Sequence, residues 1–162
     1  MKKRISVKQL AWGALIGAMY AFITYAVLPL SSGLMQLRVS EALCILPYFT
    51  FSAVPGLFIG CIIGNILCAS AIWDVVFGSL ATLAAAYLTY LMGRRRINRF
   101  LAPLPAVVLN ALVIGALLSY VYQIGVPFAV SAVYVGVGQA LACYALGMPL
   151  FFIIKRLKNK LF

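Results

Sequence analysis

The chain has 162 residues, of which 65% are hydrophobic and only 9% are charged, and its mean hydropathy is +1.10. Soluble domains carry about a quarter charged residues and roughly half apolar ones, so a soluble fold of this length could not bury so much apolar surface. The formal net charge of +11 would suit nucleic acid or an anionic membrane surface, and the placement of the charges decides between them.

Twelve of the 13 basic residues fall in three clusters that flank long apolar stretches. The clusters are Lys2, Lys3, Arg4 and Lys8; Arg94, Arg95, Arg96 and Arg99; and Lys155, Arg156, Lys158 and Lys160. This is the positive-inside pattern, so we expect all three clusters and both termini on the cytoplasmic face. Basic and aromatic residues do not interleave, and we expect no nucleic-acid partner.

The clusters also predict the number of membrane crossings. If they share one face, each interval between them holds an even number of helices. Turn residues interrupt the first interval three times and the second once, and a helix needs roughly 20 residues to cross. The sequence therefore predicts an all-α, six-helix integral membrane bundle, a single transmembrane domain over residues 1–162. Its helices are expected at 9–28, 40–52, 55–69, 74–93, 103–122 and 128–154.

The second and third predicted helices are short for a membrane crossing. At 1.5 Å per residue each covers only about 20 Å. We expect them to be tilted, kinked or sheltered by neighbouring helices, and Pro47 could bend the second.

The four cysteines lie inside these predicted helices, and the chain has no histidine. They are Cys44, Cys61, Cys68 and Cys143. Without zinc-site spacing they are interpreted as small packing residues, and we expect neither a metal nor another cofactor.

Charges outside the basic clusters are few. The only acidic residues, Glu41 and Asp74, and the remaining basic residue, Arg38, all fall at the predicted outer ends of helices. Charges near a membrane interior are costly and often mark function. The alternatives are that both acids stabilise helix N-termini, or that Arg38 and Glu41 pair with each other.

Uncharged polar residues lie deeper in the predicted bundle. Asn65, Asn110 and Gln139 suit a small polar ligand that enters from outside, and Tyr87 offers a stacking surface. The alternative interpretations are hydrogen bonds between helices for the amides and membrane-interface packing for the tyrosine.

Small residues recur four apart on several predicted helices, which allows close helix approach. Gly13 and Gly17 lie beside Ala14 and Ala18 on the first helix, and Gly56 begins a row on the third. Packing within the bundle explains the third helix. On the first helix, contact with another subunit is a second possibility.

Motifs for chemistry are not found. The sequence lacks a phosphate-binding G-x-x-x-x-G-K-[ST] loop and a nucleophile elbow, and it has no histidine. An enzyme, perhaps one acting on lipid, and a self-sufficient pump are therefore disfavoured. A binding subunit driven by partners is favoured, and a structural subunit without a ligand remains an alternative.

Three segments carry a family resemblance. QLRVSEAL at 36–43, AVPGLFIGCIIGNIL at 53–67 and DVVFGSLATLAAAYLTY at 74–90 resemble the QueT family of queuosine-precursor transporters. These are substrate-binding S components of energy-coupling-factor (ECF) importers in the bacterial cytoplasmic membrane. An S component for a different vitamin is the nearest alternative.

The resemblance implies partners, a ligand and a site. The partners are a transmembrane T component, which family members meet through an A-x-x-x-A face, and two cytoplasmic ATPases. The face maps onto Ala14 and Ala18, with Ala11 as a less certain extension. The ligand is a 7-deazaguanine, preQ1 favoured over preQ0, bound from outside. Its expected contacts are Glu41, Asp74, Asn110, Gln139, Arg38, Asn65 and Tyr87, beneath a lid formed by residues 29–39.

Overall fold

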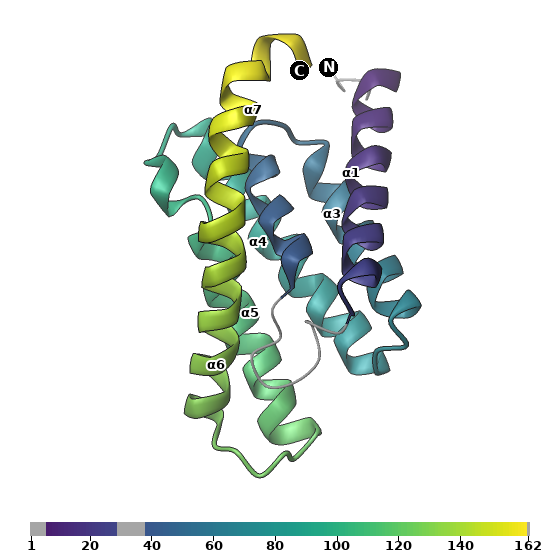
Figure 1. Ribbon diagram of the computed structural model, residues 1–162, viewed down its shortest axis with the longest axis vertical. Coiled ribbons are helices and arrows are strands. Elements are labelled where there is room, and N and C mark those ends of the chain that lie inside the picture. Colours follow the sequence, from purple (N-terminus) through teal and green to yellow (C-terminus); the bar gives the residue numbers. More distant parts are fainter. Residues whose placement is uncertain (1–5, 29–37, 162) are drawn as a thin grey trace, which may run out of the picture.

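The computed structural model describes residues 6–28 and 38–161, and all regular secondary structure in this part of the chain is helical. In chain order the elements are α1 (Val7–Ala26), η1 (Val39–Tyr48), α3 (Ala53–Leu67), η2 (Asp74–Gly78), α4 (Ser79–Arg94), η3 (Arg99–Leu101), α5 (Leu104–Ala116), η4 (Leu117–Val121), α6 (Phe128–Ala140), η5 (Leu141–Gly147) and α7 (Met148–Leu161). Several are continuous, so that η2 leads into α4, α5 into η4, and α6 through η5 into α7 (Figure 1).

Four helical stretches are long and apolar enough to cross a membrane. They are Val7–Ala26, Asp74–Arg94, Arg99–Val121 and Phe128–Leu157. The chain is therefore a multi-pass membrane protein, and the predicted crossings at 9–28, 74–93, 103–122 and 128–154 each have a counterpart. The last helix continues past 154, to Leu161.

The two other predicted crossings are shorter helices, η1 and α3, so six full crossings are not confirmed. Helix η1 is sheltered as expected, because every residue from Ser40 to Pro47 is buried. It is a 3₁₀ helix, which rises about 2.0 Å per residue and so covers roughly 20 Å with its 10 residues.

Helix η1 ends at Tyr48, four residues before the rough predicted end at residue 52. Pro47 has no N–H to contribute to the helix. The last turn instead closes on the Leu46 carbonyl, which accepts from Phe49 N at 3.0 Å and Thr50 N at 3.3 Å. The chain then reverses into α3 within four residues.

Helices α1 and α3 approach each other through glycine. A Cβ atom on Gly17 would lie 2.8 Å from the Gly56 carbonyl oxygen, and one on Gly56 would lie 2.5 Å from that of Gly13. A Cβ on Gly60 would lie 2.6 Å from the Gly17 carbonyl oxygen. The two backbones are therefore in direct contact, and the glycine row of α1 is used for packing inside the chain.

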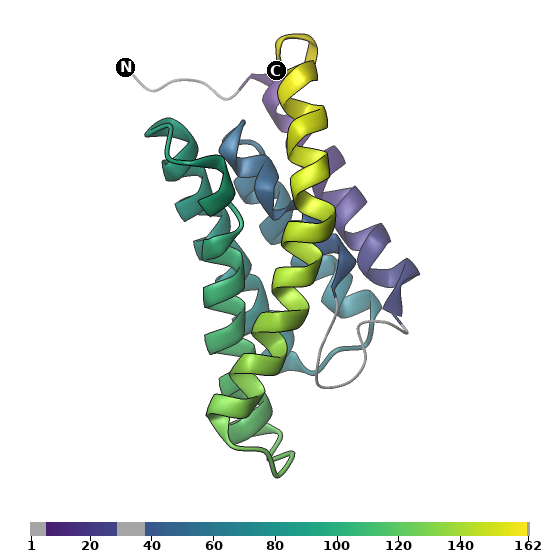
Figure 2. The same cartoon turned by 60° about the vertical axis from the view of Figure 1, so that its left-hand side comes forward.

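The two ends of the bundle differ in charge. The start of α1, the connection from α4 to α5 and the end of α7 lie at the same end (Figures 1 and 2). These segments carry the basic residues whose side chains the structure describes, namely Lys8, Arg94, Arg95, Arg96, Arg99, Lys155 and Arg156. The connection from η4 to α6 lies at the opposite end (Figure 1). These basic residues therefore share one end of the bundle, as the positive-inside pattern requires.

Candidate substrate-binding site

The centre of the candidate site is the carboxylate of Glu41, in the first turn of η1, whose residue is only 1% exposed. Tyr20 OH on α1 donates a short hydrogen bond to Oε1. Oε2 accepts from Gln139 Nε2 on α6 at 2.8 Å and from Cys44 Sγ at 2.7 Å. Three elements thus hold this buried charge through neutral donors, which is the arrangement that a buried carboxylate needs.

Local helix geometry explains how these donors reach Glu41. In a 3₁₀ helix residues i and i+3 eclipse, which places the Cys44 thiol beside the carboxylate. On α1, Tyr20 continues the buried row that begins with Gly13 and Gly17. Gln139 lies one residue before the end of α6, where the π-helical segment η5 begins. Such π segments are frequent at functional sites.

A second group of polar side chains surrounds Asp74 at the start of η2. Asn65 Nδ2 on α3 donates to the Asp74 backbone carbonyl at 3.3 Å, and Arg38 Nη1 lies 3.4 Å from Asn65 Oδ1. Tyr122 OH donates to Asp74 Oδ2 at 2.8 Å. The other carboxylate oxygen, Oδ1, is buried and has no hydrogen-bond partner among the described residues. A buried acceptor left in this way is costly unless a ligand or water supplies a donor.

A small cavity connects the two groups. Arg38, Asn110 and Gln139 contribute its polar lining, and Ile114 and Val135 contribute its apolar walls. Its volume of about 10 Å³ is close to the minimum for one water molecule. A ligand larger than a water molecule can therefore enter only if these side chains move apart.

The charges of the site are unbalanced. Its two carboxylates, Glu41 and Asp74, face a single guanidinium, that of Arg38, which leaves a formal charge of minus one. Burial, followed by the hydrogen bond to Asp74, raises the pKa of Tyr122 to about 12. Tyr122 therefore stays protonated at neutral pH and remains a donor to Asp74.

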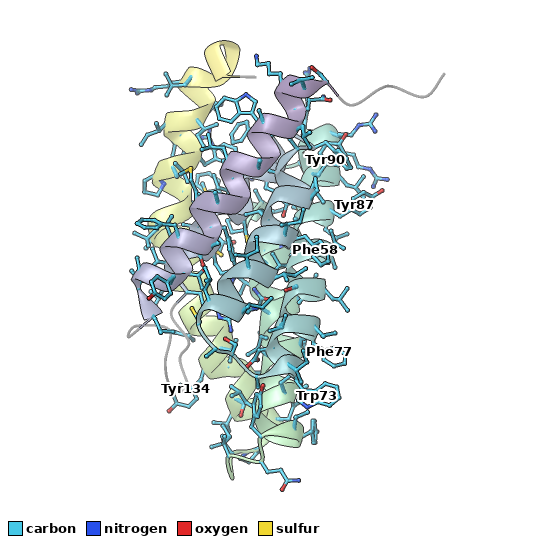
Figure 3. All side chains as sticks on the ribbon, turned by 90° about the vertical axis from the view of Figure 1, so that its right-hand side faces the viewer. Phe58, Trp73, Phe77, Tyr87, Tyr90 and Tyr134 are labelled. Carbon is cyan, nitrogen blue, oxygen red and sulfur yellow. The ribbon has the colours of Figure 1, made fainter. Side chains whose placement is uncertain are left out.

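Six of the seven residues predicted for the site form one connected cluster. From one end to the other these are Glu41, Gln139, Asn110, Arg38, Asn65 and Asp74. The structure does not bring Tyr87 to them. Its side chain is 49% exposed on α4 and points away from the bundle (Figure 3). More than three helical turns separate Tyr87 from Asp74. Its position agrees with packing at the membrane interface rather than with stacking on a ligand.

Four contributing residues were missed by the sequence interpretation. Tyr20 and Tyr122 donate to the two carboxylates, and Cys44 and Cys143 donate their thiols to the Glu41 side chain and carbonyl. The position of Tyr20, three residues after Gly17, was a usable signal, because it continues the buried face of α1. Both cysteines are buried, as packing residues would be, and their thiols also donate hydrogen bonds to Glu41.

The expected partner face on α1 is open. Ala11, Ala14 and Ala18 are all exposed. Ala14 and Ala18 line an apolar groove of about 460 Å³ between α1 and α3, and Ala11 is not part of its lining. The predicted lid over residues 29–39 lies, except for its last two residues, outside the described part of the chain.

A multi-pass helical bundle that buries a cluster of charged and polar side chains is typical of membrane proteins that bind a small molecule. The chain belongs to the QueT transporter family, whose model matches residues 10–156. No curated protein and no solved structure matches it significantly. The family is that of a transport subunit rather than an enzyme.

Proposed function

We propose that this chain is the substrate-binding S component of an ECF importer that takes up a 7-deazaguanine precursor of queuosine. It captures the ligand on the outer side of the bacterial cytoplasmic membrane, with both termini in the cytoplasm. The observation that carries the proposal is the buried Glu41 carboxylate, held by neutral donors beside a small polar cavity. Membership of the QueT family supports the substrate class.

Glu41 is assigned to the edge of the base. A guanine-like edge presents two N–H donors side by side, and a carboxylate accepts such a pair with high geometric selectivity. The amide of Gln139 can rotate from Glu41 towards a ring acceptor, because it also lines the cavity. Asn110, which lines the cavity, and Asn65, which contacts Asp74 and Arg38, are assigned to the remaining polar atoms of the ring.

Asp74 is assigned to the aminomethyl group that distinguishes preQ1 from preQ0. Its Oδ1 lacks a hydrogen-bond partner in the described residues, and an ammonium would supply one. The formal charge of minus one in the site would also be neutralised by a cationic ligand. Both features favour preQ1, whereas preQ0 would leave the orphaned oxygen and the excess charge in place.

The transport partners are a T component and two cytoplasmic ATPases. The chain has no phosphate-binding loop of its own, so the energy must come from elsewhere. The alanine face of α1, with Ala14 and Ala18 in the groove and Ala11 at its margin, is the proposed contact for the T component. Small residues there permit close helix approach.

Calorimetry on the purified subunit in detergent tests the proposal. We expect tight binding of preQ1, weaker binding of preQ0 and guanine, and none of riboflavin. If a folded sample binds neither deazaguanine but binds another vitamin, the chain is an S component for a different nutrient. If it binds no small molecule, the substrate-binding role is wrong.

Two conservative variants test the assignment of the acids. Glu41→Gln removes the acceptor for the base edge and should weaken preQ1 and preQ0 at least tenfold, or about 1.4 kcal/mol. Asp74→Asn should weaken preQ1 at least tenfold and preQ0 by much less, because only preQ1 carries the ammonium. Equal losses for both ligands in Asp74→Asn would reject the separate roles.

A further inference from the structure

A second pocket lies at the basic end of the bundle, and it shares no lining residue with the cavity of the candidate substrate site. Its volume is about 540 Å³, and its lining comes from η1, the end of α4, the connection to α5, and α7. Three cationic side chains from two separate parts of the chain contribute to it. They are Arg96 and Arg99 from the connection and Lys155 from α7.

The connection that carries two of these cations is held firmly in place. Tyr48 OH donates to the Ile97 carbonyl at 2.7 Å, and Thr89 Oγ1 donates to the Ala102 carbonyl at 3.1 Å. Asn98 Oδ1 accepts from Phe100 N at 3.1 Å and caps η3. At Gly93 a Cβ atom would clash with the Tyr48 carbonyl, so α4 touches the backbone of η1 here. The basic side chains therefore project from a preorganised frame.

Arg99 is also oriented by aromatic rings. Its guanidinium carbon lies 5.2 Å from the ring centre of Phe100 and 5.1 Å from that of Phe152. These contacts use the faces of the guanidinium and leave its N–H edge available to an acceptor. Lys155 adds a point charge from α7.

The positive charge of this pocket is not compensated by acidic side chains. The chain has only two, Glu41 and Asp74, and both belong to the substrate-site cluster. Cations brought together on a rigid frame without a counter-charge favour an anionic ligand. A phosphate group matches the fork of Arg99 and the ammonium of Lys155.

The surroundings of the pocket distinguish a lipid from a free anion. Phe100 and Phe152 are 50% and 40% exposed, and Leu101 in the same turn is 42% exposed. These side chains offer an apolar surface beside the cations. Basic pockets between helix ends at the membrane surface bind anionic lipid head groups. We propose that this pocket is a binding site for the phosphate head group of an anionic phospholipid, with its acyl chain along Phe100 and Phe152.

Native mass spectrometry of the full chain in detergent tests the site. Phosphatidylglycerol and phosphatidylcholine with identical acyl chains are added in turn, and the lipid retained is measured. Arg99→Gln/Lys155→Gln should weaken phosphatidylglycerol retention at least tenfold. The matched control is Arg95→Gln/Arg156→Gln, which removes the same charge from exposed positions outside the pocket and should change retention less than twofold.

Each outcome bears on the proposal. Preferential retention of phosphatidylglycerol, lost only in the pocket variant, supports it. Equal losses in both double variants, or equal retention of the two lipids, overturns it. Displacement of the lipid by millimolar inorganic phosphate would instead assign the pocket to a free anion. The thermal midpoint of each variant confirms folding, and the readout does not depend on deazaguanine binding.

Discussion

Two rows of small residues lie side by side on α1 and have different surroundings. The glycine row, Gly13 and Gly17, is buried against the backbone of α3. The alanine row, Ala14 and Ala18, is exposed and, together with the edge of the glycine row, lines the apolar groove between α1 and α3. In the sequence both rows have the same four-residue spacing and differ by one position, about 100° around the helix.

The difference shows what a small-residue row means in a membrane helix. Such a row permits close approach, but which backbone approaches depends on the rest of the fold. Glycine is required where the α3 carbonyls face α1 directly, because even a methyl group would clash. Alanine is sufficient on the open face, where the alanine row is the proposed contact for the T component.

The largest expected effect comes from filling the glycine contact. In Gly56→Ala the new Cβ would lie 2.5 Å from the Gly13 carbonyl, and neither backbone can move without separating α1 from α3. We expect a loss of stability at or above the upper end of the roughly 1–3 kcal/mol typical of overpacking. Thermal unfolding in detergent measures it.

Gly136→Ala is the matched control for this contact. Its Cβ would lie 3.4 Å from the Ala111 Cβ, an ordinary packing distance. The substitution should be neutral or stabilise α6 by up to about 1 kcal/mol, because alanine is the better helix former. Similar destabilisation in both variants would show that the α1–α3 contact is not special.

The second-largest effect concerns the alanine row. Ala14→Leu/Ala18→Leu adds side-chain bulk to the groove at two exposed positions of α1 and leaves every glycine in place, so folding and ligand binding should be unchanged. Assembly with the T component and uptake should fall at least tenfold, which co-purification and transport assays measure. Ala84→Leu, exposed on α4 outside the groove, is the control. Loss of ligand binding in the double variant would contradict separate roles for the two rows.

Much of the fold could be predicted from the sequence. Long apolar stretches bounded by basic clusters give the four long helices within a few residues, because length and charge alone decide a crossing. Most residues of the candidate site could also be named from the sequence. Charged and amide side chains are so rare in this chain that Glu41, Asp74 and Arg38 had few other places to find partners.

The remainder depended on tertiary contacts. No propensity in VSEALCILPY indicates that η1 is a 3₁₀ helix, although its burial was expected. Residues such as Tyr20 and Cys44 contribute to the site through helix geometry rather than through residue type. Tyr87 is the reverse case, a residue that was assigned to the site but faces away from it. It lies on a helix that contributes to the site, but its side chain is exposed.

A smaller effect on ligand affinity is expected from changing Tyr20, which lies on the same buried face of α1 as Gly13 and Gly17. Tyr20→Phe removes the donor to Glu41 Oε1 but keeps the ring. The carboxylate loses one of the bonds that fix its orientation, and preQ1 affinity should fall about fivefold, or roughly 1 kcal/mol. Tyr25→Phe on the same helix, with a side chain that is 57% exposed, should bind normally. Equal affinity in both variants would argue that Tyr20 only packs.

The smallest expected effect is that of Tyr87→Phe. Because this side chain is half exposed on the outer surface of α4, removing its hydroxyl should change preQ1 affinity less than twofold (Figure 3). Tyr122→Phe is the comparison, since it removes the donor to Asp74 and should weaken preQ1 several-fold. Calorimetry on both variants ranks the two tyrosines. A larger loss for Tyr87 would mean that the ligand lies between α4 and a partner, and the connected cluster around Glu41 would then have to be a structural network instead.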